Sequence, residues 1–498
     1  MAGTPPTTRA FRNVFLPTEG VSLTLEEDRL VVKDKALAKR FRVKVCGIPF
    51  GSALSTITIP YYNILWSDTT VPTSITIHYT VWKSKTTLSR ETLTYSLNDE
   101  RASQVAQAWS DRLLSLSYGK AQRQRRAKVL INPHAGPGHA VSIWENEVRP
   151  MFLHARMTID ETRTTRQGEG TDICENLDID AYDMVVVVSG DGLAHEVLNG
   201  FAKRPDARRA LKQVALAHIP AGSGNALSLN LNGSHRPGPC ALAVIKGVTT
   251  DVDLMSVTQG DRRLLSFLSQ SVGIIAECDL GTENLRWLGA KRFDVGVAYR
   301  IFNKRVYPCD VAVRTEIRDK AEITAHYRRV QRGESKVANV EESAGGEAGD
   351  GLPVLRFGTV NDEVPADWDK FSLDTMGSFY CGNMAWMAPN ANFFPAALAN
   401  DGLMDVVTNN GDIPRMEYIN LMTDIEKGRF YDNTRVTYRK IVAYRFTPRN
   451  QEDGYISIDG ERIPFEPFQV EVHPGLATMI SKSGKFDAFG PTGWEEAK

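Results

Sequence analysis

A run of four valines followed by a carboxylate between two glycines constrains this chain more than any other stretch. Val185–Val188 predicts a strand buried on both faces. The sequence Ser189-Gly190-Asp191-Gly192 then predicts a tight turn, because glycine tolerates backbone angles that other residues avoid. Helical spacing resumes at Glu196, and a helix start offers free N–H groups and a positive dipole end that suit phosphate. A carboxylate in an anion site needs a metal ion or a proton transfer to explain it, so Asp191 indicates phosphoryl-transfer chemistry.

Two further glycine-rich loops follow predicted strands in the same part of the chain. The strand 128–131 ends at Asn132-Pro133-His134-Ala135-Gly136-Pro137-Gly138, and the strand 214–219 ends at Pro220-Ala221-Gly222-Ser223-Gly224-Asn225. Either loop alone is weak evidence. In an open α/β sheet the loops after the strands gather at one edge, where ligands bind. The three loops together therefore predict an α/β nucleotide-binding domain over residues 128–245, with backbone N–H groups of Gly136, Gly192 and Ser223 cradling phosphates.

The chain of 498 residues is too long for one hydrophobic core, and its N-terminal part differs from the α/β region. Residues 1–20 predict a disordered tail. Residues 21–119 predict short strands closed by a helix from Asp99 to about Leu116. This pattern resembles a pleckstrin-homology-like module, and an undescribed β-sandwich with a packing helix fits it as well. The helix is expected to turn one apolar stripe inward, made of Ala102, Val105, Trp109, Leu113 and Leu116.

The remaining regions are a linker and a second β-rich part. Residues 120–127 hold several arginines and predict a solvated basic linker, a type of segment that also suits anionic lipid. Residues 246–490 return to a β pattern. Within them a disordered insertion is expected at about 320–365, because residues 331–352 are rich in Glu, Gly, Ser and Ala and offer little apolar surface to bury.

Composition narrows the classes of protein and partner. The formal net charge is −1, so no overall field favours nucleic acid. The six cysteines lie far apart and show no metal-ligand spacing, which predicts reduced thiols in a cytoplasmic protein. The first twelve residues lack the apolar centre of a signal peptide. No apolar run approaches the ~20 residues that cross a bilayer, so we expect any membrane contact to be peripheral.

The three loops, taken in order, resemble the diacylglycerol-kinase catalytic domain that several classes of lipid kinase share. Within that set, the segments 188–200 and 220–227 are most similar to those of sphingosine kinases. The resemblance covers about 126–310 and 370–482. It implies a phosphofructokinase-like α/β domain for the nucleotide and a C-terminal β-sandwich domain for the lipid. It also implies ATP and Mg²⁺ as cofactors and a sphingoid long-chain base as substrate.

The resemblance also assigns roles to residues. Asp191 would accept the hydroxyl proton as general base or hold Mg²⁺, with Glu461 as a second metal ligand, partly through water. Asp279, Ser269 and Glu283 would bind the lipid head group. The nucleotide would contact residues of the loops and of later motifs: Asn132, Pro133, His134, Gly136, Gly138, Thr164, Ser189, Gly190, Gly192, Glu196, Gly222, Ser223, Gly224, Asn225, Arg286, Arg292, Asp459, Gly460 and Glu461.

Several of these residues have simpler explanations, and two depart from the family pattern. Arg286 and Arg292 on an amphipathic helix are usually solvated, and Glu196 could serve only the helix dipole. The first loop carries histidines, including His134, where many sphingosine kinases have Lys or Arg, which leaves less charge to neutralise a triphosphate. Glu277 stands where Asp is common, so its longer side chain is expected to alter the head-group pocket.

The sequence therefore predicts an ATP-dependent kinase for the primary hydroxyl of sphingosine, dihydrosphingosine or phytosphingosine. A ceramide or diacylglycerol kinase, an NAD kinase and a lipid-binding pseudokinase are the alternatives. We expect the substrate and a membrane surface as partners, with peripheral association to intracellular or plasma membranes. Neither the preferred base nor the oligomeric state is predicted.

Overall fold

The computed structural model describes residues 13–35, 43–45, 48–50, 56–69, 74–97, 100–282, 295–296, 298–299, 303, 305–334, 349–426, 429–488 and 494. The chain divides into two compact units. The first comprises residues 1–124 and 147–158, and the second comprises residues 125–146 and 159–498. No helix within the described residues is long and apolar enough to cross a membrane.

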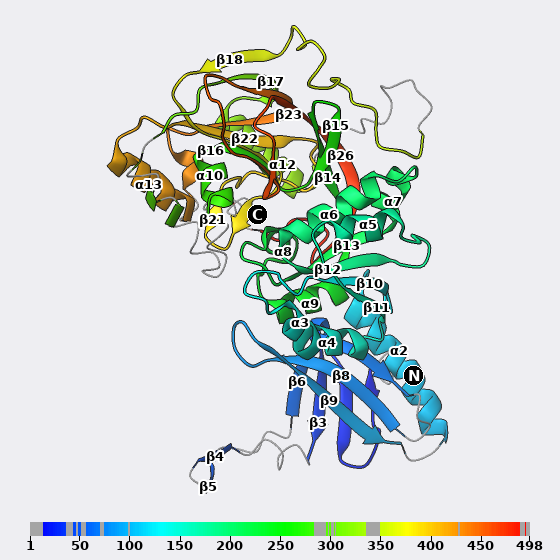
Figure 1. The fold of residues 1–498 in the computed structure, drawn as a ribbon. Helices are drawn as coiled ribbons and strands as arrows, with labels where there is room; N and C mark the ends of the chain where they lie inside the picture. The colour runs from blue at the N-terminus through cyan, green and yellow to red at the C-terminus, as the bar shows by residue number, and fades with distance from the viewer. Residues whose placement is uncertain are drawn as a thin grey trace, which may run out of the picture. The chain divides into compact units, whose positions relative to one another are not determined.

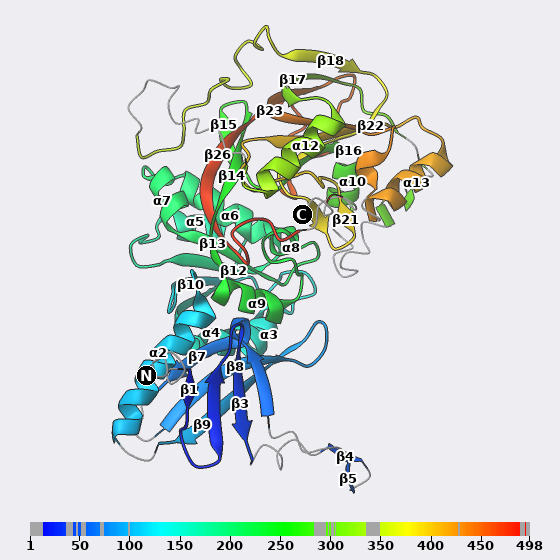
Figure 2. The ribbon, with the colours of Figure 1, turned by 180° about the vertical axis from the view of Figure 1, so that it is seen from behind.

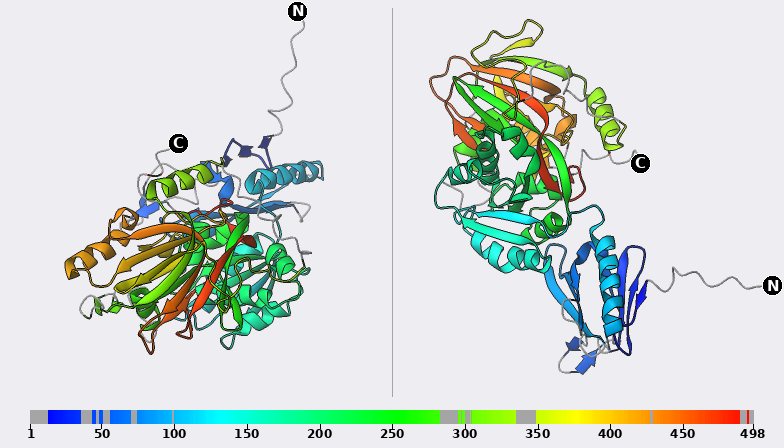
Figure 3. Two further views of the ribbon diagram at one scale, coloured as in Figure 1. Left: turned by 90° about the horizontal axis from the view of Figure 1, so that it is seen from above. Right: turned by 90° about the vertical axis from the view of Figure 1, so that its right-hand side faces the viewer.

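The first unit consists of two small antiparallel sheets and a long helix. One sheet has the order β1 (Val14–Phe15), β2 (Val21–Leu25), β3 (Arg29–Asp34) and β6 (Thr56–Pro60). The other consists of β7 (Ile64–Asp68), β8 (Ser74–Trp82) and β9 (Leu88–Ser96), and a further pair is formed by β4 (Val43–Val45) and β5 (Ile48–Phe50). The helix α2 (Glu100–Tyr118) lies against the strands (Figures 1 and 3), and the short α4 (Arg149–His154) also belongs to this unit.

The apolar stripe of α2 differs in one position from the prediction. Trp109 and Leu113 are buried in a core with Phe15 and the inner faces of both sheets, as expected. Val105, however, is 52% exposed. Ala106 is buried in its place, so the stripe runs one residue to the side of Val105. Two sheets with a closing helix are compatible with a pleckstrin-homology-like module and with a β-sandwich, so the fold of this unit does not distinguish the two.

The second unit begins with a parallel sheet in the order β11 (Thr158–Arg163), β10 (Arg126–Ile131), β12 (Met184–Ser189) and β13 (Ala215–Pro220). Val129 pairs with Val186, and Val186 pairs with Ala217. Every residue of β12 is buried, as the valine run predicts. The surrounding helices are α3 (Ala140–Ile143), the π-helical turn Trp144–Val148, α5 (Glu169–Glu175), α6 (Asp191–Ala202), α7 (Ala207–Gln213), α8 (Ala226–Asn232) and α9 (Pro237–Lys246).

The basic linker is not fully solvated. Arg125 is buried, and its guanidinium donates to the carbonyl oxygens of Val244 (3.0 Å) and Gly247 (2.7 Å). These carbonyls lie at the end of α9, where carbonyl groups have no partner within the helix and a cation is favourable. The prediction for residues 120–127 was therefore wrong at Arg125, and β10 already begins at Arg126.

The β-rich part of the second unit is continuous with the parallel sheet. The last strand, β26 (Phe468–Ser481), pairs in parallel with β13 at Leu216 and Met479 and runs antiparallel to β14 (Val248–Gln259) (Figure 2). The other strands are β15 (Arg262–Ser266), β16 (Ser269–Gly273), β17 (Cys309–Ile317), β18 (Asp369–Leu373), β19 (Met376–Gly382), β20 (Trp386–Ala388), β21 (Ala391–Asn392), β22 (Met404–Asn410), β23 (Thr437–Pro448), β24 (Ile456–Ile458) and β25 (Glu461–Ile463). The helices are α10 (Ile274–Leu280), α12 (Lys320–Gln331) and α13 (Arg415–Glu426).

The expected disordered insertion at about 320–365 is wrong for much of its length. Residues 320–331 form α12, which buries Ile323 and Tyr327 one helical turn apart. His326 Nε2 lies 2.9 Å from a carboxylate oxygen of Asp401. Further on, the backbone N–H groups of Arg356 and Phe357 donate to Glu471. Residues 335–348 lie outside the described residues.

Asp401 has a structural role in a buried cluster of charges. Lys440, which is fully buried, donates to Asp401 (3.0 Å) and Asp405 (3.1 Å). Although burial opposes ionisation, the charges of Lys440 and His326 outweigh it and lower the pKa of Asp401. A buried cation with two carboxylate partners avoids the large cost of an unpaired charge.

Candidate active site

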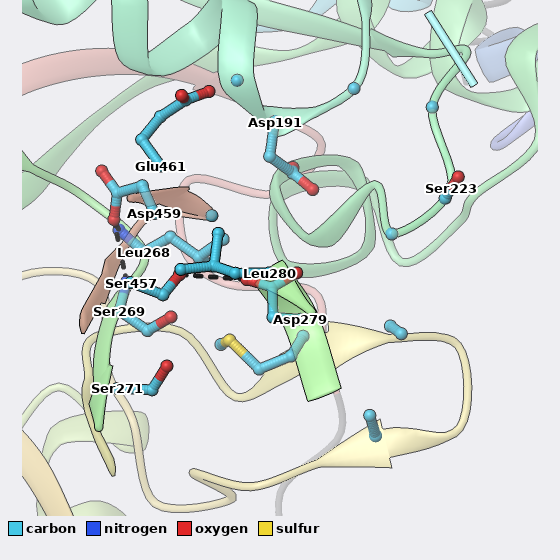
Figure 4. A pocket seen from close by; sticks show the side chains of 18 of the residues that line it. Asp191, Ser223, Leu268, Ser269, Ser271, Asp279, Leu280, Ser457, Asp459 and Glu461 are labelled. Carbon is cyan, nitrogen blue, oxygen red and sulfur yellow. Dashed lines mark hydrogen bonds between the residues drawn. The ribbon is translucent and has the colours of Figure 1, made fainter. Parts of the chain in front are cut away.

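One cavity of about 900 Å³ joins the glycine loops to the β-rich part of the second unit (Figure 4). Polar groups of the three loops line one end. The other end is lined mainly by the apolar side chains of Ile275, Leu280, Phe393, Met422 and Ile425, and also by Asn390 and Glu426. Met387 adjoins the third loop, because its carbonyl oxygen lies 3.3 Å from where a Cβ of Gly224 would be. Most residues predicted for the site line this cavity: Asn132, His134, Gly136, Thr164, Ser189, Gly190, Asp191, Gly192, Glu196, Gly222, Ser223, Gly224, Ser269, Asp279, Asp459, Gly460 and Glu461.

The three loops approach one another so closely that side chains would not fit between them. A Cβ atom on Gly222 would lie 2.4 Å from the Cα of Gly190. A Cβ atom on Gly136, whose φ is +51°, would lie 2.8 Å from the carbonyl oxygen of Ala221. The predicted gathering of the loops at the carboxyl edge of the parallel sheet is confirmed, and it explains why these positions are glycines.

Asp191 connects two of the loops. It is the first residue of α6, and its carboxylate accepts the backbone N–H groups of Ala226 (3.0 Å) and Leu227 (2.9 Å) at the start of α8. The carboxylate oxygens keep lone pairs that can face the cavity, which Asp191 lines. Asn225, a predicted nucleotide ligand, instead exchanges hydrogen bonds with the backbone of Gly222 (2.8 and 2.7 Å) and does not line the cavity. Pro133 and Gly138 do not line it either.

Asp459 has a structural role that the sequence did not predict. Its side chain is fully buried and accepts five hydrogen bonds from protein groups. Three come from consecutive backbone N–H groups of residues 267–269, one from Ser266 Oγ (2.6 Å) and one from His195 Nδ1 (2.9 Å). The carboxylate therefore holds the turn between β24 and β25 in place, and a nucleotide contact by Asp459 stays a prediction.

Sequence reasoning assigned no role to His195, which joins α6 to that turn. Burial disfavours the imidazolium, but the hydrogen bond and charge of Asp459 outweigh it and raise the pKa of His195. One turn later on the same face, Asn199 exchanges hydrogen bonds with the backbone of Leu265 in β15. His195 stands within the motif itself, four residues after Asp191, so its position on α6 was the available signal.

Glu461 lies beside the first turn of α6, and Glu196 is a residue of α6 itself. Glu461 Oε1 lies 3.3 Å from where a Cβ of Gly192 would be, so this carboxylate is next to the second loop. Gln167 donates to its other oxygen at 3.1 Å. Glu196 accepts the backbone N–H of Gly170 (2.9 Å), at the start of α5. A structural role for Glu196 is thereby established alongside its place in the cavity wall.

The head-group position is at the junction of the polar and apolar ends. Asp279, on α10, accepts a hydrogen bond from Ser457 Oγ (3.0 Å), and Figure 4 shows both side chains at the cavity. Ser269 Oγ lies 3.4 Å from Tyr380 Oη on the neighbouring strand β19, and burial raises the pKa of that phenol. Glu283, the third predicted head-group residue, lies outside the described residues, as do Arg286 and Arg292.

Glu277 does not enter the head-group pocket. It is buried and accepts hydrogen bonds from Tyr307 Oη (2.5 Å) and from Arg305 (3.2 Å). The longer side chain reaches these partners on the segment that precedes β17. The predicted effect of Glu277 on the pocket was wrong, because α10 turns it to the face opposite the cavity. Cys278, between Glu277 and Asp279, is a buried core residue.

Comparison with known proteins follows the same division of the chain. Residues 126–257 match the diacylglycerol kinase catalytic domain, and residues 356–481 match a C-terminal domain described as NAD kinase β-sandwich-like. Residues 14–119 match a domain of unknown function. The chain is 34% identical to sphingoid long chain base kinase 4 of Schizosaccharomyces pombe over 89% of this chain and 92% of that protein.

The chain belongs to the sphingoid long-chain-base kinase family. Two further relatives agree with this assignment. Sphingoid long chain base kinase 5 of Saccharomyces cerevisiae is 32% identical over 76% of this chain and 62% of its own length. Human sphingosine kinase 1 is 30% identical over 73% of this chain and 92% of its own length. The diacylglycerol-kinase-type α/β domain and the C-terminal β-sandwich are thus both established.

This sphingoid-base kinase carries cations at the cavity that the sequence reasoning missed. Arg166 and Arg462 both line the cavity. Each has a carboxylate partner, Asp172 for Arg166 and Asp453 for Arg462, and both guanidinium groups remain about half exposed or more. Arg462 directly follows Glu461, so its place next to the Asp-Gly-Glu motif was the available signal. These arginines lie in the described part of the chain and can supply positive charge that the first loop, which has no Lys or Arg, does not.

The carboxylates at the cavity suit a magnesium ion that is bound together with phosphate groups. Among the described residues no group of three or more His, Cys, Asp or Glu side chains is arranged to hold a metal. Mg²⁺ is commonly held by one or two carboxylates together with substrate phosphates. Asp191 and Glu461 line the same cavity on the two sides of Gly192, which meets that requirement.

Proposed function

We propose that this chain transfers the γ-phosphoryl group of ATP to the primary hydroxyl of a sphingoid long-chain base, such as sphingosine, dihydrosphingosine or phytosphingosine. The observation that carries this proposal is the single cavity that runs from phosphate-type loops, past Asp279, to an apolar end. A long hydrocarbon chain with a cationic head needs those three environments in that order. Ceramide and diacylglycerol would place an uncharged group beside the carboxylate of Asp279.

Phosphoryl transfer depends on positioning and charge neutralisation more than on covalent chemistry. In the proposed complex, backbone N–H groups of Gly136, Gly192 and Ser223 bind phosphate oxygens. Arg166 and Arg462 add positive charge. Mg²⁺ would be held by Glu461 together with phosphate oxygens, and by Asp191 where Asp191 is a metal ligand and not the base; the ion would supply further neutralisation of the transferring group. Nucleotide contacts by Arg286 and Arg292 remain a prediction.

Two carboxylates have the remaining roles in the proposed reaction. Asp191 accepts the proton of the substrate hydroxyl, because it lies at the loop edge with its orientation fixed by two backbone N–H groups. Asp279 pairs with the ammonium group, and Ser457 fixes the carboxylate for that contact. The apolar wall of α10 and α13 then receives the hydrocarbon chain.

The proposal extends to the way the enzyme meets its substrate. A sphingoid base resides in a bilayer, so we propose peripheral association with intracellular or plasma membranes. The pleckstrin-homology-like assignment of residues 21–119 belongs to this proposal as well. A liposome sedimentation assay with and without residues 1–119 tests it, and equal sedimentation of both proteins contradicts it.

The direct test is transfer of radiolabelled phosphate from ATP to a panel of sphingosine, ceramide, diacylglycerol and NAD. We expect product only with sphingosine. Product with ceramide or diacylglycerol alone would overturn the choice of substrate. Binding of sphingosine without product from any acceptor would instead identify a lipid-binding pseudokinase.

A further inference from the structure

A small side pocket opens beside the apolar end of the main cavity. It has a volume of about 10 Å³, the size that holds a single water molecule or hydroxyl group. It shares Ile275, Tyr380, Phe393 and Met422 with the main cavity. The two cavities therefore adjoin at a shared wall, which is where a group that branches from a bound lipid chain would meet the side pocket.

Two buried polar atoms of side chains in the wall of this side pocket have no hydrogen-bond partner among the described residues. Ser378 Oγ and Asn409 Oδ1 are both buried, and the residues are only 6% and 8% exposed. The other side chains in the wall are Val407, Phe430 and the four shared with the main cavity. Leaving a buried polar group unpaired is costly, so such groups need an occupant to explain them.

Strand register fixes the position of this pair relative to the head group. Ser271 pairs with both Ser457 and Tyr380, so the row that contains Ser457 is next to Asp279. The next row on the same face joins Gly273 to Ser378, and Ser378 to Asn409. Two residues along a strand advance by about 7 Å. The polar pair thus lies one row beyond the head-group carboxylate, toward the hydrocarbon.

Gly273 allows close packing at this row. Its φ is +86°, and a Cβ atom there would lie 2.4 Å from the carbonyl oxygen of Gly377 and 3.2 Å from Cδ2 of Tyr307. Strand β16 therefore adds no side chain to the row that contains Ser378 and Asn409.

We propose that Ser378 and Asn409 form a hydroxyl-binding subsite that selects a sphingoid base carrying an additional hydroxyl on its chain near the amine. This inference rests on the proposed function and deepens it by naming a specificity determinant. Ser378 Oγ can donate to or accept from that hydroxyl, and Asn409 Oδ1 accepts from it. A base without the hydroxyl leaves both groups unpaired, and discrimination of this kind is stronger than discrimination by size alone.

The test compares two bases that differ by one hydroxyl, dihydrosphingosine and phytosphingosine, presented in the same detergent micelles. Wild-type kinase is compared with Ser378→Ala and Asn409→Leu. Thr408→Val is the matched control, since alternation along β22 points Thr408 to the other face. The readouts are kcat/KM for each base and the thermal midpoint of each variant.

We expect the wild type to favour phytosphingosine and each variant to reduce that preference by roughly ten-fold, through loss on phytosphingosine alone. The thermal midpoint should stay equal or rise, because an apolar replacement removes an unpaired polar group. Ser378→Ala deletes a single oxygen atom, so it remains informative if Asn409→Leu does not fold.

An unchanged ratio of the two bases in both variants would overturn the subsite. Equal losses on both bases, or a lowered midpoint, would overturn it in favour of a buried structural water. If the wild type phosphorylates neither base, the proposed function itself fails and the subsite with it. If both bases react equally well with every protein, only the subsite fails.

Discussion

Replacement of Asp459 by Asn separates a structural carboxylate from a nucleotide ligand. One oxygen of Asp459 accepts from Ser266, Leu268 and Ser269, and the other accepts from His195 and Phe267. Asparagine keeps only one acceptor oxygen. Its amide nitrogen would face two donors, so at least two hydrogen bonds are lost and two buried donors are left unpaired.

The size of the effect follows from those bonds. A hydrogen bond to a charged group contributes about 1.5–3 kcal/mol, and two of them give an expected loss of about 3–6 kcal/mol in the free energy of unfolding. Removal of the buried charge returns part of this, so the lower half of the range is expected. For a protein, a loss of this size is large compared with the usual effect of one substitution.

The assay is urea unfolding followed by fluorescence, with Asp453→Asn as the matched control. Asp453 makes the same type of contact, to Arg462 at 3.4 Å, but its side chain is 79% exposed, so its loss should be below about 1 kcal/mol. If Asp459→Asn loses less than about 1 kcal/mol while its ATP affinity falls strongly, the argument from buried hydrogen bonds is refuted.

Four further outcomes are expected. Asp191→Asn should lower kcat by ~10²–10⁴-fold while calorimetry shows ATP binding retained, and activity above about a tenth of wild type contradicts its role as base. Asp279→Asn should raise the KM for sphingosine at least ~10-fold, because the substitution leaves the ammonium group unpaired. The KM for ATP and the thermal midpoint should not change. An unchanged KM for sphingosine with a lowered midpoint would mean that Asp279 is only structural. Deleting residues 335–348 should leave kcat and the thermal midpoint unchanged. A longer deletion that also removes α12 should lower the midpoint, because the contact of His326 with Asp401 is lost. Equal midpoints for the two deletions would contradict this. Burial lowers the pKa of His473 from 6.5 to about 3, so below pH 6.5 the unfolded chain binds a proton that the folded protein does not. The free energy of unfolding should therefore fall as the pH drops toward 3, by up to about 4 kcal/mol. His473→Gln should flatten this part of the stability profile, and an identical profile would contradict the shift.

The sequence by itself determined the backbone of the phosphate site. The valine run of β12, the start of α6 after it and the glycines of three loops depend on neighbours within a few residues, and such local requirements are visible in sequence. The close approach of Gly190 and Gly222 confirms that the glycines are there for backbone contact. The three loop motifs, taken in order, also indicated the family, and the change in residue pattern along the chain indicated the division into an α/β part and a β-rich part.

Tertiary structure alone decided which polar side chains face the cavity and which hold the fold together. Asp459 and His195 are 264 residues apart in the chain and yet share a hydrogen bond, and Arg125 reaches a helix end 119 residues later. Glu277 and Asp279 stand two residues apart but bind different partners, since α10 turns them to different faces. A sequence motif shows that a carboxylate is present. In the folded protein, donors from distant parts of the chain occupy some or all of the lone pairs of that carboxylate. The carboxylate can bind a ligand only if lone pairs remain for it.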